Sequence, residues 1–156
     1  MPQVAVTTDV ITGFPGETEA MFENGLRFME GMHFADMHIF PYSKRTGTPA
    51  ARMDGQIPEE EKNRRVGLLM ELSSRMRLDY SRRFTGEILE VIPEMGSYEG
   101  DGDVELIGHS DNYLHIAFSG PKELAGRMVQ VRMTEAGIPY CRGVRLKDAV
   151  PAGASR

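Results

Sequence analysis

The sequence contains a single cysteine, Cys141, among its 156 residues. A single thiol cannot form an internal disulfide or a metal cage by itself. We interpret Cys141 as a small apolar side chain in a reducing compartment. No apolar run approaches the roughly 20 residues of a membrane-spanning helix, and the N-terminus lacks the basic start and cleavage site of a signal peptide. These absences predict a cytoplasmic protein with no membrane partner.

Basic residues are fewer than acidic ones, with 18 Lys and Arg against 23 Asp and Glu, and the net charge is -5. Such a balance is unfavourable for holding polyanionic RNA. Bases gather between residues 58 and 84, but the acids precede them there, an order that also suits a helix dipole. In the second half of the chain the cations Arg127, Arg132, Arg142, Arg145 and Lys147 face the acids Glu99, Asp101, Asp103 and Glu105. We therefore expect RNA binding on one face only.

The first half of the chain reads as two strand-helix units. Residues 4–12 alternate and predict a strand, with Val4, Val6 and Val10 on an apolar face covered by helices. Glycines and a proline then break the strand, and Thr18 is a plausible N-cap for a helix that ends near Met32. A second strand follows over residues 36–42. Two such units in series predict a parallel sheet.

The second half changes character after a long helix. Pro58 opens that helix, whose apolar positions step by three or four residues to Phe84. Beyond Gly86, short Val-, Ile- and Tyr-rich runs are separated by turn residues and predict five strands, enough for a small antiparallel barrel. We expect α/β structure over residues 1–84, an all-β domain over 85–149 and a disordered tail over 150–156.

Two loop segments carry a family resemblance. Gly-Phe-Pro-Gly-Glu-Thr at residues 13–18 and Pro-Tyr-Ser-Lys-Arg-Thr-Gly-Thr-Pro-Ala at 41–50 resemble the last strand-loop units of the radical S-adenosylmethionine (SAM) barrel in tRNA methylthiotransferases. The five-strand segment resembles a TRAM domain, in which Gly-Arg-Met-Val-Gln-Val-Arg at 126–132 looks like the characteristic strand. Gly-His-Ser-Asp-Asn-Tyr-Leu at 108–114 is similar to the segment of the MtaB branch. The resemblance implies the end of a partial TIM-type barrel joined to an OB-like TRAM barrel.

The resemblance also implies an activity for the parent protein. Such enzymes use SAM and two 4Fe-4S clusters, and the MtaB branch adds a methylthio group to threonylcarbamoyladenosine beside the anticodon of tRNA. The cluster cysteines of the family lie upstream of the region that this chain matches. The chain therefore looks like a C-terminal part, with no catalytic residue and no metal ligand of its own. It would need the N-terminal remainder as partner and would be inactive alone.

Residues in the first two strand-loop units are candidates for the rim of the SAM pocket: Asp9, Gly13, Phe14, Pro15, Gly16, His38 and Tyr42. The loop could expose N–H groups to a carboxylate or phosphate, or it could be a tight turn that binds nothing. Asp9 needs a partner if it is buried, but it could also be an acid in water at a strand end. His38 could touch adenine or the target nucleoside, or be a core histidine satisfied by a carbonyl.

Candidates for substrate binding fall in both halves of the chain: Lys44, Arg45, Thr48, Asn112, Tyr113, Arg127 and Arg132. Cations in the second loop could hold an RNA phosphate or a substrate carboxylate, although solvated loop charges are common. In the barrel segment, an amide, a stacking ring and arginines are typical of an RNA-binding surface. The expected RNA is the tRNA anticodon stem-loop.

Two other functions remain open on the sequence alone. The chain could be a standalone RNA-binding or interaction module, although two strand-helix units are too few to close a barrel. It could also belong to the branch that modifies an aspartate of a ribosomal protein. Competition by tRNA would separate that branch from the two that act on tRNA.

Overall fold

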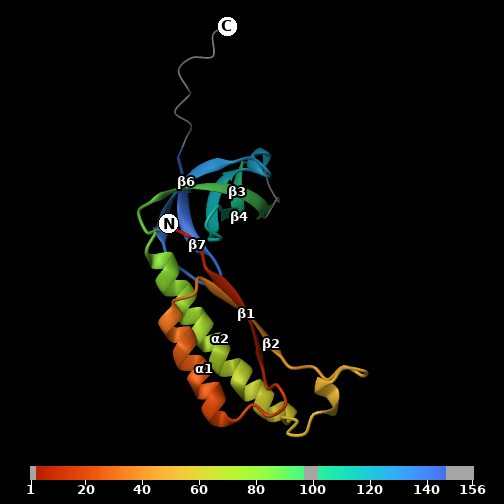
Figure 1. Cartoon of the computed structure of the whole chain (residues 1–156). Coiled ribbons are helices and arrows are strands. Elements are labelled where there is room, and N and C mark those ends of the chain that lie inside the picture. Colours follow the sequence, from red (N-terminus) through yellow and green to blue (C-terminus); the bar gives the residue numbers. More distant parts are fainter. Residues whose placement is uncertain (1–2, 97–101, 147–156) are drawn as a thin grey trace. The chain divides into compact units, whose positions relative to one another are not determined.

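The computed structural model describes residues 3–96 and 102–146, and the chain divides into two compact units, residues 1–80 and 81–156. Each unit is built from elements that are consecutive in the sequence (Figure 1). The predicted tail over 150–156, Lys147, Glu99 and Asp101 lie outside the described residues. No helix in the described part of the chain is long and apolar enough to cross a membrane.

The first unit is a two-stranded parallel sheet with two helices. Strand β1 (Thr7–Thr12) pairs with β2 (Asp36–Pro41) in a register that runs from Thr7 opposite Asp36 to Thr12 opposite Pro41. Helix α1 (Glu19–Met32) connects them, and most of the long helix α2 (Glu59–Arg82) also belongs to this unit. The parallel pairing confirms the prediction, whereas closure into a larger barrel stays a prediction.

One face of this sheet packs on both helices. Val10 and Ile39 lie against a buried cluster, whose members are Phe22, Met29, Phe34, Met37, Leu69, Leu72 and Met76. The expectation for the first strand was wrong at Val4 and Val6, which are 47% and 49% exposed. The paired strand begins only at Thr7, opposite the first residue of β2, so these two valines precede the layer that the helices cover.

The ends of helix α1 follow from local chemistry. The side chain of Thr18 accepts a hydrogen bond from the Met21 amide at 3.2 Å, which confirms it as the N-cap. The helix ends at His33, which takes up a left-handed conformation with φ 52°. Helix α2 begins directly after Pro58, with Glu59, Glu60 and Glu61 in its first turn, where carboxylates meet the positive end of the helix dipole.

The second unit is a closed five-stranded barrel in the order β3-β4-β5-β7-β6. Its strands are β3 (Ile88–Gly96), β4 (Asp103–Ser110), β5 (His115–Pro121), β6 (Val129–Glu135) and β7 (Cys141–Arg145). All five expected strands are present, but the expectation of an antiparallel barrel was wrong at one pair, because β5 and β7 run parallel. A closed ring with an odd number of strands cannot reverse direction at every pair. The short 3-10 helices η1 (Ala50–Arg52) and η2 (Lys122–Leu124) were not expected.

The barrel interior is apolar and tightly packed. Leu106, Ile116, Val131 and Met133 are fully buried, and Cys141 is only 3% exposed, as its interpretation as a small apolar residue requires. Strands β3 and β4 approach closely at Gly108, where an added Cβ would clash with the Ile92 carbonyl and stand 2.6 Å from Pro93 Cα. Glycine is therefore needed at this position for its lack of a side chain.

We predict that Gly108→Ala destabilises the barrel by about 1–3 kcal/mol, because the new methyl meets rigid backbone. Gly67→Ala is the matched control, since its Cβ would meet nothing within 4 Å on helix α2. The control is expected to gain about 0.5–1 kcal/mol of helix stability. Thermal unfolding followed by circular dichroism measures both. Equal midpoints for the two variants would contradict the close approach.

Candidate functional site

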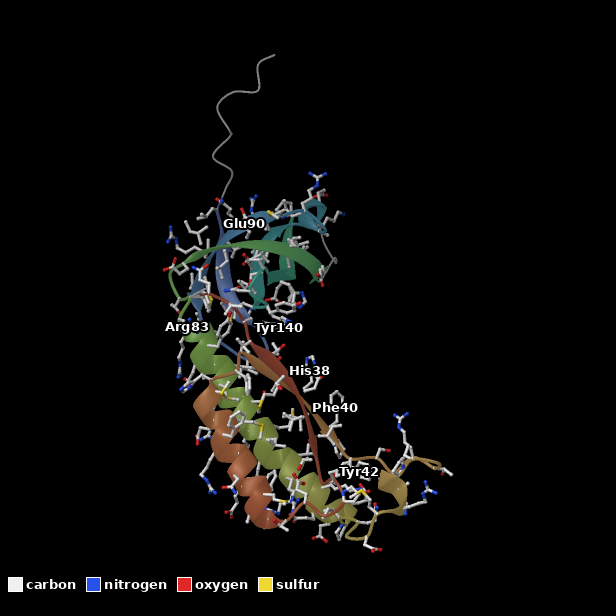
Figure 2. All side chains as sticks on the ribbon, viewed as in Figure 1. His38, Phe40, Tyr42, Arg83, Glu90 and Tyr140 are labelled. Carbon is white, nitrogen blue, oxygen red and sulfur yellow. The ribbon has the colours of Figure 1, made fainter. Side chains whose placement is uncertain are left out.

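The loops that follow β1 and β2 meet at the carboxyl ends of the two parallel strands. The Tyr42 amide donates to the Thr12 carbonyl at 2.8 Å and joins the two loop starts. Beside them lies a groove of about 450 Å³, whose lining residues are Ile11, Phe14, Phe40, Pro41, Tyr42, Ser43, Arg45, Thr48 and Ala50. Figure 2 shows His38, Phe40 and Tyr42 following one another along β2 and into the loop that follows it. The two segments that carry the family resemblance thus form a single site.

Aromatic rings form one wall of this groove. Phe14 and Tyr42 meet edge to face, with ring centroids 5.2 Å apart, and the Lys62 ammonium lies 5.5 Å from the centre of the Tyr42 ring. Ile11 and Phe40, which are register partners, are 61% and 52% exposed. The Tyr42 hydroxyl is buried and has no hydrogen-bond partner within the described part of the chain. A buried hydroxyl without a partner is costly and points to a ligand or an ordered water.

Asp9 and His38 are partners in the parallel register. Oδ1 of Asp9 lies 3.2 Å from Nδ1 of His38, and both side chains are largely exposed. His38 is therefore not a core histidine satisfied by a carbonyl, and Asp9 is an exposed acid with an imidazole neighbour. Together they present a paired hydrogen-bonding group beside the exposed rings.

Three N–H groups of the glycine-rich loop are already bonded within the protein. The Gly13 amide donates to a Glu17 carboxylate oxygen at 2.5 Å, the Gly16 amide to Gly55 at 2.9 Å, and the Glu17 amide to Phe14 at 2.9 Å. Pro15 has no N–H group. These bonds favour the tight-turn reading over an anion cradle, and the loop contributes the Phe14 ring to the groove.

A charged cluster holds this turn against helix α2. Arg65 is only 4% exposed, and its guanidinium lies 2.7 Å from carboxylate oxygens of both Glu17 and Glu61. The adjacent Arg64 donates to Glu61 and to Glu19 at 2.7 Å. Hydrogen bonds from Arg64 and then Arg65 lower the pKa of Glu61 to about 2. Burial acts to lower the pKa of Arg65, but its hydrogen bonds to Glu61 and Glu17 outweigh this and raise it.

Lys62 packs under the turn from the same helix. Its ammonium pairs with Glu59 at 2.7 Å while its stem is buried. Gly13 has φ 72°, and a Cβ there would stand 2.5 Å from Lys62 Cγ. Sequence reasoning attributed these helix charges to the dipole and missed Glu17, Lys62 and Arg65. Their roles could have been suspected from the spacing of Lys62 and Arg65, because residues three apart lie on the same face of a helix.

The second loop contributes polar groups to the groove. Arg45 and Thr48 line it, and both Lys44 and Arg45 are exposed. The Thr48 hydroxyl donates to the Arg45 carbonyl at 2.8 Å and accepts from the Ala51 amide, so it closes the turn. Arg45 is therefore the cation that the groove offers a ligand.

The predicted residues of the barrel unit are not equivalent. Asn112 is 7% exposed and accepts a hydrogen bond from the Ser110 hydroxyl at 2.5 Å, so its amide lies inside a turn. Tyr113 in the same turn is 74% exposed. Arg132 on β6 donates to the Gly86 carbonyl at 2.8 Å, and Arg127 is exposed after η2. Their role in substrate binding stays a prediction.

Metal ligands do not gather in the described part of either unit. Over residues 3–96 and 102–146, no group of three or more His, Cys, Asp and Glu side chains could hold a metal ion.

Comparison with known proteins finds relatives along most of the chain, although no family model matches. The chain is 44% identical over 143 residues to the threonylcarbamoyladenosine tRNA methylthiotransferase MtaB of Bacillus subtilis, covering 92% of this chain and 32% of that protein. It is 39% identical over 144 residues to the tRNA-2-methylthio-N(6)-dimethylallyladenosine synthase of Carboxydothermus hydrogenoformans, covering 92% and 32%. To MtaB of Thermotoga maritima it is 36% identical over 152 residues, covering 97% and 34%. The chain spans about a third of the length of these relatives.

We predict that Arg65→Ala lowers the stability of the first unit by about 3 kcal/mol, because it leaves the partly buried Glu17 carboxylate without its counter-charge. Arg64→Ala is the matched control, since that neighbour is 45% exposed at its side chain and its loss should cost much less stability. Chemical denaturation of the two variants and the parent measures the difference. Equal losses of stability in the two variants would contradict a special contribution from the buried position of Arg65.

Acid unfolding should depend on Glu61. Its folded pKa of about 2 lies below its ordinary value of 4.5, so its contribution to stability is full above that value and is lost as the pH falls toward 2. Glu61→Gln should therefore flatten the dependence of the unfolding midpoint on pH between 4.5 and 2. Thermal scans across this window test it, with Glu60→Gln in the same helix turn as control. An unchanged slope in Glu61→Gln contradicts the prediction.

Proposed function

We propose that this chain forms the C-terminal part of a tRNA methylthiotransferase, because it is similar over most of its length to relatives with that activity in their names. In this proposal residues 1–84 are the last units of the radical SAM barrel and residues 85–149 are the TRAM domain. The N-terminal remainder of the enzyme supplies the cysteines that hold two 4Fe-4S clusters. By itself the chain is inactive, and its part is to line the SAM pocket and hold the tRNA in the cytoplasm.

The proposed substrate is threonylcarbamoyladenosine beside the anticodon of tRNA. The single observation that carries this choice is the 44% identity over 92% of the chain to a relative that bears this substrate in its name. Dimethylallyladenosine is the second candidate, because a relative named for that nucleoside is 39% identical over the same share of the chain. The branch that modifies a ribosomal protein and a standalone RNA-binding module are the remaining alternatives.

The groove beside β1 and β2 is the proposed SAM site. The rings of Phe14 and Phe40 offer flat apolar surface for an adenine ring, and Ile11 adds an aliphatic side chain. The buried Tyr42 hydroxyl lacks a partner among the described residues. Asp9 and His38 add hydrogen-bonding groups on the same sheet face. When bound to a complete enzyme, SAM supplies the radical that activates the substrate carbon and the transferred methyl group. The residues of this chain would orient it and exclude water.

The cations for RNA come from the second loop and the barrel. Lys44 and Arg45 are exposed in the loop after β2, and Arg127 is exposed on the barrel. Each Lys or Arg that neutralises a phosphate makes binding weaker at higher salt. A chain with net charge -5 can hold RNA only through such local groups.

We predict salt-sensitive binding of this chain to an anticodon stem-loop, measured by fluorescence anisotropy. The double variant Lys44→Gln with Arg45→Gln should lower the salt slope by about 2, one for each phosphate contact. Arg142→Gln is the matched control, because Arg142 already pairs with Glu105 and should change the slope little. Absence of specific binding, or competition by a ribosomal-protein peptide rather than by tRNA, would overturn the assignment to the tRNA branches.

A further inference from the structure

Three rings and one aliphatic side chain form a row on the outer surface of the barrel. Ile92 on β3, His109 on β4 and His115 on β5 are opposite one another in the antiparallel register, and Tyr140 directly precedes β7. The imidazoles of His109 and His115 meet edge to face with centroids 3.9 Å apart. The ring of Tyr140 lies 6.3 Å from His115 at an interplanar angle of 20°. We call these four side chains the aromatic row. They lie on the face of each strand that is opposite the packed interior.

Tyr113 stands at the same end of the hairpin as the row. It lies in the turn between β4 and β5, and His109 and His115 lie on the two sides of that turn. Tyr113 has φ 64°, a left-handed conformation that bulky residues rarely adopt, and its ring is 74% exposed. An exposed ring gains too little packing energy to offset the free-energy cost of this backbone conformation. The outlier therefore points to a use for the exposed ring.

The turn is built to hold Tyr113 in place. The Ser110 hydroxyl donates to Asn112 Oδ1 at 2.5 Å and accepts from the Leu114 amide at 3.1 Å. The Tyr113 amide donates to the Ser110 carbonyl at 3.1 Å. Ser110 and Asn112 are buried, so the bonds are shielded from water. The ring of Tyr113 is thus presented by a rigid turn.

We propose that the aromatic row and Tyr113 form a platform on which unpaired bases of an RNA strand stack. This proposal rests on the proposed function and names the surface by which the barrel takes hold of tRNA. Bases are planar with polar edges, and His and Tyr rings match both properties. Ile92 is the one aliphatic member of the row.

The charges around the platform decide how it binds. Glu94 Oε2 lies 3.2 Å from His109 Nδ1, and the platform itself contains no Lys or Arg. The exposed carboxylate of Asp111 is in the same turn as Tyr113. Binding to the platform therefore comes from stacking rather than from phosphate contacts, and it is expected to depend weakly on salt. This separates the platform from the cations of the loop after β2.

The decisive experiment compares Tyr113→Asn with the parent chain. Asn tolerates the left-handed conformation, so the unfolding midpoint should stay equal or rise. Affinity for a labelled single-stranded oligoadenylate should fall by about tenfold or more, because a stacking partner is lost. Fluorescence anisotropy measures the affinity, and circular dichroism measures the midpoint. A residue with only a structural role would lower the midpoint and leave the affinity unchanged.

Further variants separate the outcomes. Tyr140→Ala should weaken binding and Tyr140→Phe should preserve it, while Val144→Ala, which alters an exposed side chain on β7 outside the platform, should have no effect. A blunt RNA duplex of equal length should bind more weakly than the single strand. RNA binding that none of the platform variants changes, or equal binding of duplex and single strand, overturns this proposal and leaves the proposed function standing. No RNA binding by the parent chain overturns both.

Discussion

The buried guanidinium of Arg65 is the interaction on which the first unit's site depends. It is 4% exposed and lies between Glu17, in the loop after β1, and Glu61 in its own helix. A charge at this depth is costly unless carboxylates pair with it. Because Glu17 also accepts the Gly13 amide, the ion pair fixes the turn that carries Phe14. The aromatic wall of the groove is therefore positioned by electrostatics on helix α2.

The barrel depends on a different constraint, which is closure with an odd number of strands. Four of its five neighbouring pairs are antiparallel, and the parallel pair between β5 and β7 absorbs the mismatch. After β5 the chain forms η2 and then β6, which pairs with β3, and β7 follows in the position between β6 and β5. The close approach at Gly108 lets β3 and β4 complete the ring. Outer-face residues on successive strands consequently line up in rows.

Much of this fold could be predicted from the sequence. Alternation, helical spacing and turn residues gave both strands and both helices of the first unit and all five strands of the barrel. The odd number of strands was by itself enough to exclude a closed barrel in which every pair is antiparallel. The exposure of Val4 and Val6 could not be predicted, because it depends on where β2 begins. The site was harder to predict. Residue spacing indicates that the two loops meet at the carboxyl ends of the strands. It does not indicate that Arg65 is buried, that the Asn112 amide is turned inward or that His109 contacts His115. Each of these depends on strand register and tertiary packing.

The two units also differ in how they treat unpaired backbone. In the closed barrel every strand has two neighbours, so less of its backbone is left unpaired, although β5 and β7 pair at only two positions. Within the described residues β1 and β2 pair only with each other, so each leaves one flank of its backbone open. Such flanks are templates for a further strand. If this chain joins another polypeptide by extending a sheet, we expect the added strand to lie beside β1 or β2.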